Sequence, residues 1–280
     1  MTLTERDREI IHNIHQHRFL RSTHVTALLK GSRQQLLRRL QSLFHHGYLD
    51  RPRAQLDYYR AGSQAMVYGV GHHGIKMLER EFAIPRRKVD WTAKNRAVTR
   101  YFLEHTLAVA DVMVALEIAC RKRGGVELVK HRSNHEEPFK WTVTVRQAGV
   151  SAEIGVVPDR IFGLHQKNKS DKITWIFLEA DRATMPVTRH GFKQSSFYRK
   201  LVAYQETWRQ KTLADSFPRF RVLTVTTTPE RVENLVQASQ SLSHGRGLFL
   251  FVDKSGFLSA ENVLSMGMLN GRGETVAIID

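Results

Sequence analysis

Three short helical segments follow one another at the beginning of the chain, and they constrain its fold more than any other feature. After Thr4, isoleucines recur at helical spacing, which predicts a helix over residues 4–17. A shorter helix over residues 22–30 and a third over residues 33–46 are each followed by a glycine, which favours a helix end. Two short helices joined by a tight turn predict a helix-turn-helix.

A strand, a polar basic loop and a second strand follow the third helix. Tyr48 opens the first strand, residues 49–65 form the loop, and Val67–Val70 returns as the second strand. A further helix over residues 72–84 closes the unit. This order predicts a winged helix over residues 1–85, which would bind double-stranded DNA.

Seven side chains of this unit are the candidate DNA contacts. Those at the start of the third helix would face the major groove, and those in the loop would meet phosphates. They are Arg33, Gln34, Arg38 and Arg39 on the helix and Arg51, Arg53 and Arg60 in the loop. The alternative is a winged helix that serves only dimerisation and carries these charges as a solvated face.

The charge of the chain supports a polyanionic partner. The sequence has 43 Lys and Arg against 27 Asp and Glu, a net charge of +16. Residues 1–90 hold 16 basic and 8 acidic side chains and the remainder 27 and 19, so the N-terminal third is twice as basic per residue. We therefore expect nucleic acid as the partner, with the basic residues 86–97 forming a linker that follows the DNA backbone.

Hydropathy argues against a membrane location. The sequence has no run of about 18 apolar residues, and its N-terminus is charged from Glu5, so we expect neither a spanning helix nor a secretory signal. Attachment to a membrane surface is not expected either, because the candidate helices need their apolar faces for a core. We predict a cytoplasmic bacterial protein, and the single cysteine, Cys120, is expected to be a small core residue.

Residues 98–280 predict a second, mixed α/β domain. A helix over residues 98–120 is apolar nearly all round and is interrupted by Glu104, His105 and Asp111, which must find partners or belong to a site. Three to four strands follow, including one expected over residues 153–164. A long helix is then expected within residues 186–212, followed by a strand, a helix and another strand.

Three carboxylates lie at the ends of two of these strands. Asp159 follows Pro158 within an apolar strand, and Glu179 and Asp181 end another strand at alternate positions, so both face one side of the sheet. If the strands are neighbours, the three oxygen donors converge and would suit Mg²⁺ or Mn²⁺. The alternative is that Asp159 is a turn residue and that Glu179 pairs with an arginine, Arg160 or Arg182.

Several motifs together resemble a known family. The predicted winged helix, followed by EHTLAVADVMVAL, VPDRIFGL, FLEADRATMP and KLVAYQ, is similar to the replication-relaxation family of plasmids and integrative conjugative elements. The resemblance spans roughly residues 5–255. It implies a second domain over residues 98–280 that is similar to the PD-(D/E)xK nuclease fold, with a core order of helix, three strands, helix and strand.

The resemblance also implies a set of catalytic residues. Glu104 matches the acid of the first helix, Asp159 the carboxylate of Pro-Asp, and Glu179 the following acid. Where the nuclease pattern has lysine this sequence has Asp181, whose negative charge cannot neutralise a developing phosphorane. The lysine would then come from the next helix, as Lys200 or, second in order, Lys193.

Two functions follow from the sequence. The first is a double-stranded DNA-binding protein of a mobile element, a homodimer that works with other replication or conjugation proteins in plasmid replication, DNA processing or regulation. The second is a Mg²⁺- or Mn²⁺-dependent endonuclease or relaxase that nicks DNA at an origin. In this second case the sequence does not distinguish Tyr198 from Tyr204 as a nucleophile.

Overall fold

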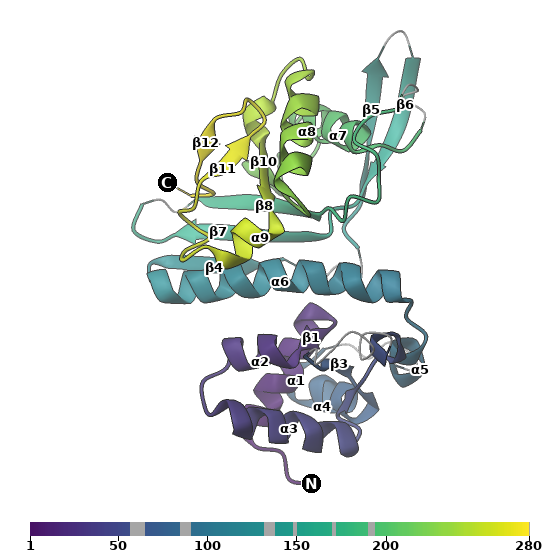
Figure 1. Ribbon diagram of the computed structural model, residues 1–280, viewed down its shortest axis with the longest axis vertical. Coiled ribbons are helices and arrows are strands. Elements are labelled where there is room, and N and C mark those ends of the chain that lie inside the picture. The colour runs from purple at the N-terminus through teal and green to yellow at the C-terminus, as the bar shows by residue number, and fades with distance from the viewer. Residues whose placement is uncertain are drawn as a thin grey trace. The chain divides into compact units, whose positions relative to one another are not determined.

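A computed structural model of the chain describes residues 1–56, 65–84, 91–131, 138–147, 150–169, 172–189 and 194–279 (Figure 1). Within these residues the protein is of the mixed α/β class, as the sequence predicts. The chain divides into two compact units, Met1–Val114 and Ala115–Asp280. The expected boundary lay at residues 86–97, so the first unit is longer than the predicted winged helix.

The described part of the first unit combines helices with a small antiparallel sheet. Its elements are α1 (Glu5–His17), β1 (Leu20–Arg21), α2 (Ser22–Leu28), α3 (Arg33–His45), β2 (Leu49–Asp50), β3 (Val67–Val70), α4 (His72–Phe82), α5 (Trp91–Arg96) and the beginning of α6 (Arg100–Arg123). Strand β3 is central and pairs antiparallel with β1 and β2. The sequence predicts this order up to α4 except for β1, whose two residues are too few to show a pattern.

The predicted apolar faces of the first unit form its core. Ile10, Ile11 and Ile14 of α1 and Leu36, Leu40 and Leu43 of α3 are completely buried. Helix α4 packs closely on the chain before β2, because a Cβ atom at Gly74 would lie 2.3 Å from the carbonyl oxygen of Tyr48. Only glycine fits this approach of two backbones.

Residues 91–97 differ from the expected basic linker. Residues 91–96 form helix α5, and Asn95 is completely buried. The Asn95 Nδ2 atom donates to the carbonyl oxygen of Val70 (2.9 Å), and its Oδ1 atom accepts from Arg18 Nη1 (2.7 Å). These two buried hydrogen bonds of Asn95 join the segment to the rest of the first unit. Residues 85–90 lie outside the described residues.

The second unit is built on a large mixed sheet. Its elements after α6 are β4 (Val126–Lys130), β5 (Trp141–Gln147), β6 (Val150–Val156), β7 (Arg160–Gln166), β8 (Ile173–Ala180), α7 (Phe197–Arg209), β9 (Phe220–Thr226), α8 (Pro229–Gln240), η2 (Arg246–Leu248), β10 (Phe249–Asp253), α9 (Lys254–Ser259), β11 (Met268–Asn270) and β12 (Thr275–Val276). The strand order is β12-β11-β10-β9-β8-β7-β4. Strands β8, β9 and β10 are parallel, and the other neighbours are antiparallel.

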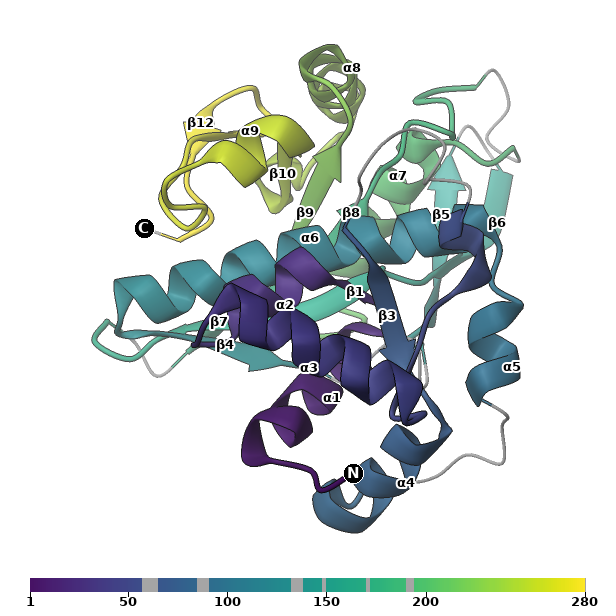
Figure 2. The same cartoon turned by 60° about the horizontal axis from the view of Figure 1, so that its bottom comes forward.

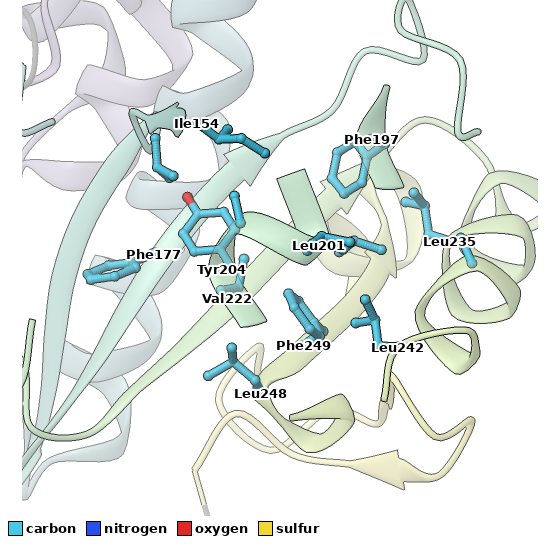
Figure 3. Packing of buried hydrophobic residues seen from close by; sticks show 14 of the residues in the cluster. Ile154, Phe177, Phe197, Leu201, Tyr204, Val222, Leu235, Leu242, Leu248 and Phe249 are labelled. Atoms are coloured by element: carbon cyan, nitrogen blue, oxygen red, sulfur yellow. The ribbon is translucent and has the colours of Figure 1, made fainter. Parts of the chain in front are cut away.

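Two helices and a hairpin cover one face of this sheet. The parallel strands are joined through α7 and α8, and β5 and β6 form a separate two-stranded sheet that stands beside α7 (Figures 1 and 2). Figure 3 shows the resulting core, in which Leu201 and Tyr204 of α7 lie over Phe177, Val222 and Phe249 of the sheet. The core therefore fixes α7 over the end of β8.

The element order agrees with the expected core once the hairpin is set apart. Helix α6, strands β4, β7 and β8, helix α7 and strand β9 follow the predicted sequence of helix, three strands, helix and strand, with β5 and β6 inserted. The strand expected over residues 153–164 is divided between β6 and β7, and Asp159 lies in the break rather than inside a strand. Pro158 favours that break because it has no N–H for a sheet hydrogen bond.

The helix expected within residues 186–212 is shorter than predicted. Helix α7 begins only at Phe197, after Ser196, whose Oγ atom accepts from the backbone N–H of Arg199 (3.2 Å). Cys120 is a buried core residue, as predicted, and burial raises the pKa of its thiol to about 11. Among the described helices, including the 24 residues of α6, none combines the length and hydropathy that crossing a membrane requires.

Candidate functional site

Helix α3 presents a polar cationic face to solvent. Arg33, Gln34 and Arg38 are exposed, whereas the leucines on the other side of the helix are buried. The arrangement arises because the leucines recur at spacings of three and four residues, which places them on one side. The structure therefore leaves three of the four predicted α3 contacts available to a partner.

Arg39 is the exception on this helix, because its guanidinium is engaged by another helix of the first unit and is only partly exposed. Its guanidinium makes two hydrogen bonds to Asp7 of α1, one of them from Nε to Oδ1 at 2.8 Å. Asp7 is completely buried and also forms a capping box with Thr4. Burial alone would raise the pKa of Asp7, but the bonds from Arg39 and Thr4 outweigh it and hold this pKa below its usual value. Arg39 thus joins α3 to α1.

The loop arginines differ in their surroundings. Arg51 is half-buried, and its guanidinium lies 4.1 Å from the ring centroid of Phe44 and donates to the hydroxyl of Tyr68 (3.1 Å). Arg53 is exposed, and Arg60 lies outside the described residues. Arg51 therefore packs on aromatic rings, so that of the described loop arginines only Arg53 has the exposure expected of a phosphate contact.

Asp111 of α6 shows how one polar residue of the apolar helix is satisfied. Its Oδ1 atom accepts from Arg21 Nη1 and lies 2.7 Å from His24 Nε2. These three residues belong to the first unit, and Asp111 is buried. The sequence indicated that Asp111 needs partners but gave no sign of which residues these are.

In the second unit, Asp159, which directly precedes β7, lies opposite Glu179 of the neighbouring strand β8. Arg160 of β7 pairs with Leu178 of β8, so the residues one step further, Asp159 and Glu179, are also neighbours. The backbone N–H of Asp159 donates to Leu178 (3.0 Å), and the Asp159 Oδ2 atom accepts from the N–H of Ala180 (2.8 Å). The predicted proximity of these two carboxylates is present in the structure.

Helix α7 provides two partners for Glu179. Lys200 Nζ donates to Glu179 Oε2 (2.6 Å), and the Tyr204 hydroxyl donates to Glu179 Oε1 (2.7 Å). The two side chains are four residues apart and thus share one side of the helix. Glu179 therefore pairs with a lysine and a tyrosine, and the alternative pairing with Arg160 or Arg182 is wrong. The sequence predicts Lys200 as a candidate site residue. The spacing of four residues between Lys200 and Tyr204 is the signal that would have added Tyr204 to the site.

Burial dominates the electrostatics of this cluster. The Glu179 side chain is 3% exposed and that of Lys200 is 39% exposed, so the desolvation cost falls mainly on the carboxylate. Burial raises the pKa of Glu179, Lys200 opposes the rise, and Asp159 adds to it. Burial alone would lower the pKa of Lys200, but Glu179 and Asp159 keep it above its usual value. Burial, with Glu179 beside it, raises the pKa of Tyr204 far above its usual range.

Asp181 does not join this pair. Its Oδ2 atom accepts from Thr226 Oγ1 (2.7 Å) and from Arg231 Nε of α8 (2.9 Å). Glu179 and Asp181 face the helices on the same side of the sheet, as predicted, but each has its own cation. Across the described residues there is no group of three His, Cys, Asp or Glu side chains that could hold a metal ion. The three-carboxylate set does not assemble, and the pair of Asp159 and Glu179 is what remains for a divalent ion with additional water ligands.

Glu104 is part of the other compact unit of the chain. It belongs to the first unit, where its carboxylate accepts from Arg100 Nε (2.7 Å), whereas Asp159, Glu179 and Lys200 belong to the second. Its expected catalytic role therefore stays a prediction. Lys193, the second lysine candidate, lies outside the described residues.

The model of the replication-relaxation family matches residues 11–219, three quarters of the chain. The chain belongs to the replication-relaxation family. For a member of this family, a role in the replication or relaxation of plasmids and other mobile elements follows. The match includes the polar face of α3 and also the residues of the Asp159–Glu179–Lys200 cluster. Neither a curated protein nor a solved structure matches the chain.

Proposed function

We propose that this family member binds double-stranded DNA of a mobile genetic element and acts in plasmid replication, conjugative DNA processing or their regulation. The observation that carries the proposal is the exposed face of α3 with Arg33, Gln34 and Arg38. Arginine and glutamine offer the donors that read guanine and adenine edges in the major groove. The order α1, β1, α2, α3, β2, β3 supports a winged helix as the reading unit, and a homodimer would let two such helices bind a palindromic site.

The proposal is tested by measuring fluorescence anisotropy of labelled duplexes with the full chain. Duplexes of equal length would tile the origin regions of the element that encodes the protein, with unrelated duplexes for comparison. We expect one or a few tiles to bind roughly a thousand-fold more tightly than the unrelated duplexes at physiological salt. Equal affinity for every duplex would contradict sequence recognition, and the absence of binding at low salt would contradict DNA binding itself.

Strand cleavage is a second candidate function, and one specific observation favours it. Lys200 from the helix after β8 meets Glu179, so a lysine is present although Asp181 replaces the expected one. Asp159 and Glu179 would hold a divalent ion, which when bound supplies Lewis-acid polarisation and an activated water. Lys200 would neutralise charge on the scissile phosphate, and the Tyr204 hydroxyl would fix the orientation of the Glu179 carboxylate.

Cleavage is tested with supercoiled plasmid that carries the cognate origin, incubated with the full chain and Mn²⁺. If the second function is correct, the wild type nicks the plasmid, the Asp159→Asn variant does not, and the matched variant Asp215→Asn, which changes an exposed acid of the second unit, nicks normally. A wild type without nicking activity, or a nicking activity that survives Asp159→Asn, would eliminate this function.

A further inference from the structure

A group of exposed cations lies where α6 ends and where the chain turns from β7 to β8. The last turn of α6 provides three of them, the turn after β7 two, and the position before β8 one. These side chains, which we call the α6/β7 patch, are Arg121, Lys122, Arg123, Lys167, Lys169 and Lys172. All of them belong to the second unit.

The sheet brings these two stretches of chain together. Strand β4 follows α6 directly and pairs antiparallel with β7, with Val126 opposite Gln166. The backbone N–H of Lys167 donates to the carbonyl oxygen of Gly125 (3.0 Å). The end of β7 therefore lies beside the residues that leave α6. The turn continues with a hydrogen bond from the N–H of Lys169 to Gln166 (3.0 Å).

The patch holds much of the positive charge of its unit. The second unit contains 24 Lys and Arg and 17 Asp and Glu, an excess of seven. The six cations of the patch are accompanied by Glu117, which pairs with Arg121, by Glu127, which pairs with Lys167 (2.9 Å), and in the sequence by Asp171, outside the described residues. Six positive and three negative side chains give this area a net charge of +3, out of +7 for the whole unit. The charge is thus concentrated rather than evenly spread.

Stabilisation of a helix end accounts for only part of this arrangement. Cations in the last turn of a helix interact favourably with its carbonyl groups, which explains basic residues at positions 121–123. The effect does not extend to the three lysines of the patch that come from the β7–β8 connection, because these are not part of the helix. These two separate segments together carry more positive than negative side chains, and this excess favours a polyanion as the partner.

We infer that the α6/β7 patch binds the phosphate backbone of double-stranded DNA without reading its sequence. The inference rests on the proposed DNA-binding function and adds a second contact to that of α3. Four of the six cations are lysines, whose compact ammonium groups suit phosphate oxygens, and phosphate binding releases counterions. A membrane surface is the weaker partner, because the large exposed apolar residues described in the second unit, Val157, Trp208 and Leu258, are not among the patch.

The test compares full-length variants on an unrelated duplex of about 40 base pairs over a range of salt concentrations. The patch variant is Lys122→Gln/Arg123→Gln/Lys169→Gln, and the control Lys211→Gln/Arg219→Gln/Arg272→Gln removes three exposed cations elsewhere in the same unit. Each phosphate contact contributes about 0.9 to the slope of log K against log salt, so we expect the patch variant to lose about two to three from the slope. We also expect its affinity at low salt to fall about tenfold or more, whereas the control stays near the wild type.

Several outcomes would overturn the inference. An unchanged slope for the patch variant, or an equal loss in the control, would show that the patch makes no local contact. Loss of binding to phosphatidylserine vesicles with unchanged DNA binding would assign the patch to a membrane. If the wild type binds DNA and only substitutions on α3 weaken it, the inference fails while the proposed function stands. If the wild type binds no duplex, both fail.

Discussion

Replacement of Lys200 with methionine is expected to lower the free energy of unfolding by about 2–3 kcal/mol near neutral pH. Methionine keeps the length and apolar stem of the side chain but removes the ammonium group that binds Glu179 at 2.6 Å. The loss of one partner leaves a buried carboxylate without its cation, which in fully buried pairs costs about 3–5 kcal/mol. We expect less here because the Lys200 side chain is 39% exposed and water screens part of the interaction.

The loss of stability in the Lys200→Met variant should increase as the pH rises. Burial raises the pKa of Glu179 in the folded chain above its ordinary value of about 4.3. A carboxyl group with a raised pKa binds its proton more tightly when folded, so its contribution to stability falls as the pH rises through that range. Lys200 opposes the rise, and its removal moves the pKa of Glu179 further up. The difference between variant and wild type should therefore be small near pH 4–5 and largest above neutrality.

Urea unfolding of the two proteins at about pH 5 and about pH 7.5 measures this difference. Lys140→Met is the matched control, because Lys140 is an exposed lysine of the same unit. Tyr204→Phe, which removes the other hydrogen bond to Glu179, should lower the free energy of unfolding by about 1–2 kcal/mol. This loss should also increase as the pH rises. A Lys200→Met variant as stable as the wild type at both pH values would mean that the pair is not formed in solution.

Replacement of Arg33 and Arg38 with alanine is expected to weaken binding to the cognate duplex by about 10- to 100-fold. Both side chains lie on the exposed face of α3, away from its buried leucines, so the substitution leaves the core intact. Anisotropy titrations of the double variant should show a larger loss on the cognate duplex than on an unrelated one, because contacts to base edges carry the sequence preference.

Two controls separate a local contact from other effects. Arg219→Ala/Arg272→Ala removes the same charge from exposed positions of the second unit and should leave affinity for the cognate duplex near that of the wild type. Arg39→Ala should lower the melting temperature without changing the affinity of the folded protein, because Arg39 binds the buried Asp7. Affinity at low salt that is unaffected by the loss of Arg33 and Arg38 would contradict the role of α3.

Local spacing explains why much of the first unit could be predicted. The isoleucines of α1 and the leucines of α3 recur with the period of a helix, and this pattern specifies both the element and its buried side without reference to the rest of the chain. The exposure of Arg33, Gln34 and Arg38 follows from the same pattern. Arg39 has the same local pattern, and only the position of Asp7 on another helix distinguishes it.

The candidate site of the second unit was only partly predictable. The alternation along β8 placed Glu179 and Asp181 on one side, and the following helix supplied Lys200. The sequence grouped the three carboxylates, whereas the structure pairs Asp181 with Arg231 and divides the group. That choice depends on how α8 packs over the sheet, which no local pattern contains.

The sequence by itself determined the mixed α/β class, the order of most helices and strands, and the candidate site residues. These are properties of neighbouring residues, because the spacing of apolar side chains and the backbone preferences of proline and glycine affect only one or two turns of chain. Only the tertiary structure decided that residues 91–97 pack into the first unit and that β5 and β6 leave the main sheet. It also decided that the chain segments with the α6 and β7 cations lie side by side. Such contacts join residues far apart in the chain, and their free energy depends on distances and burial that exist only after folding.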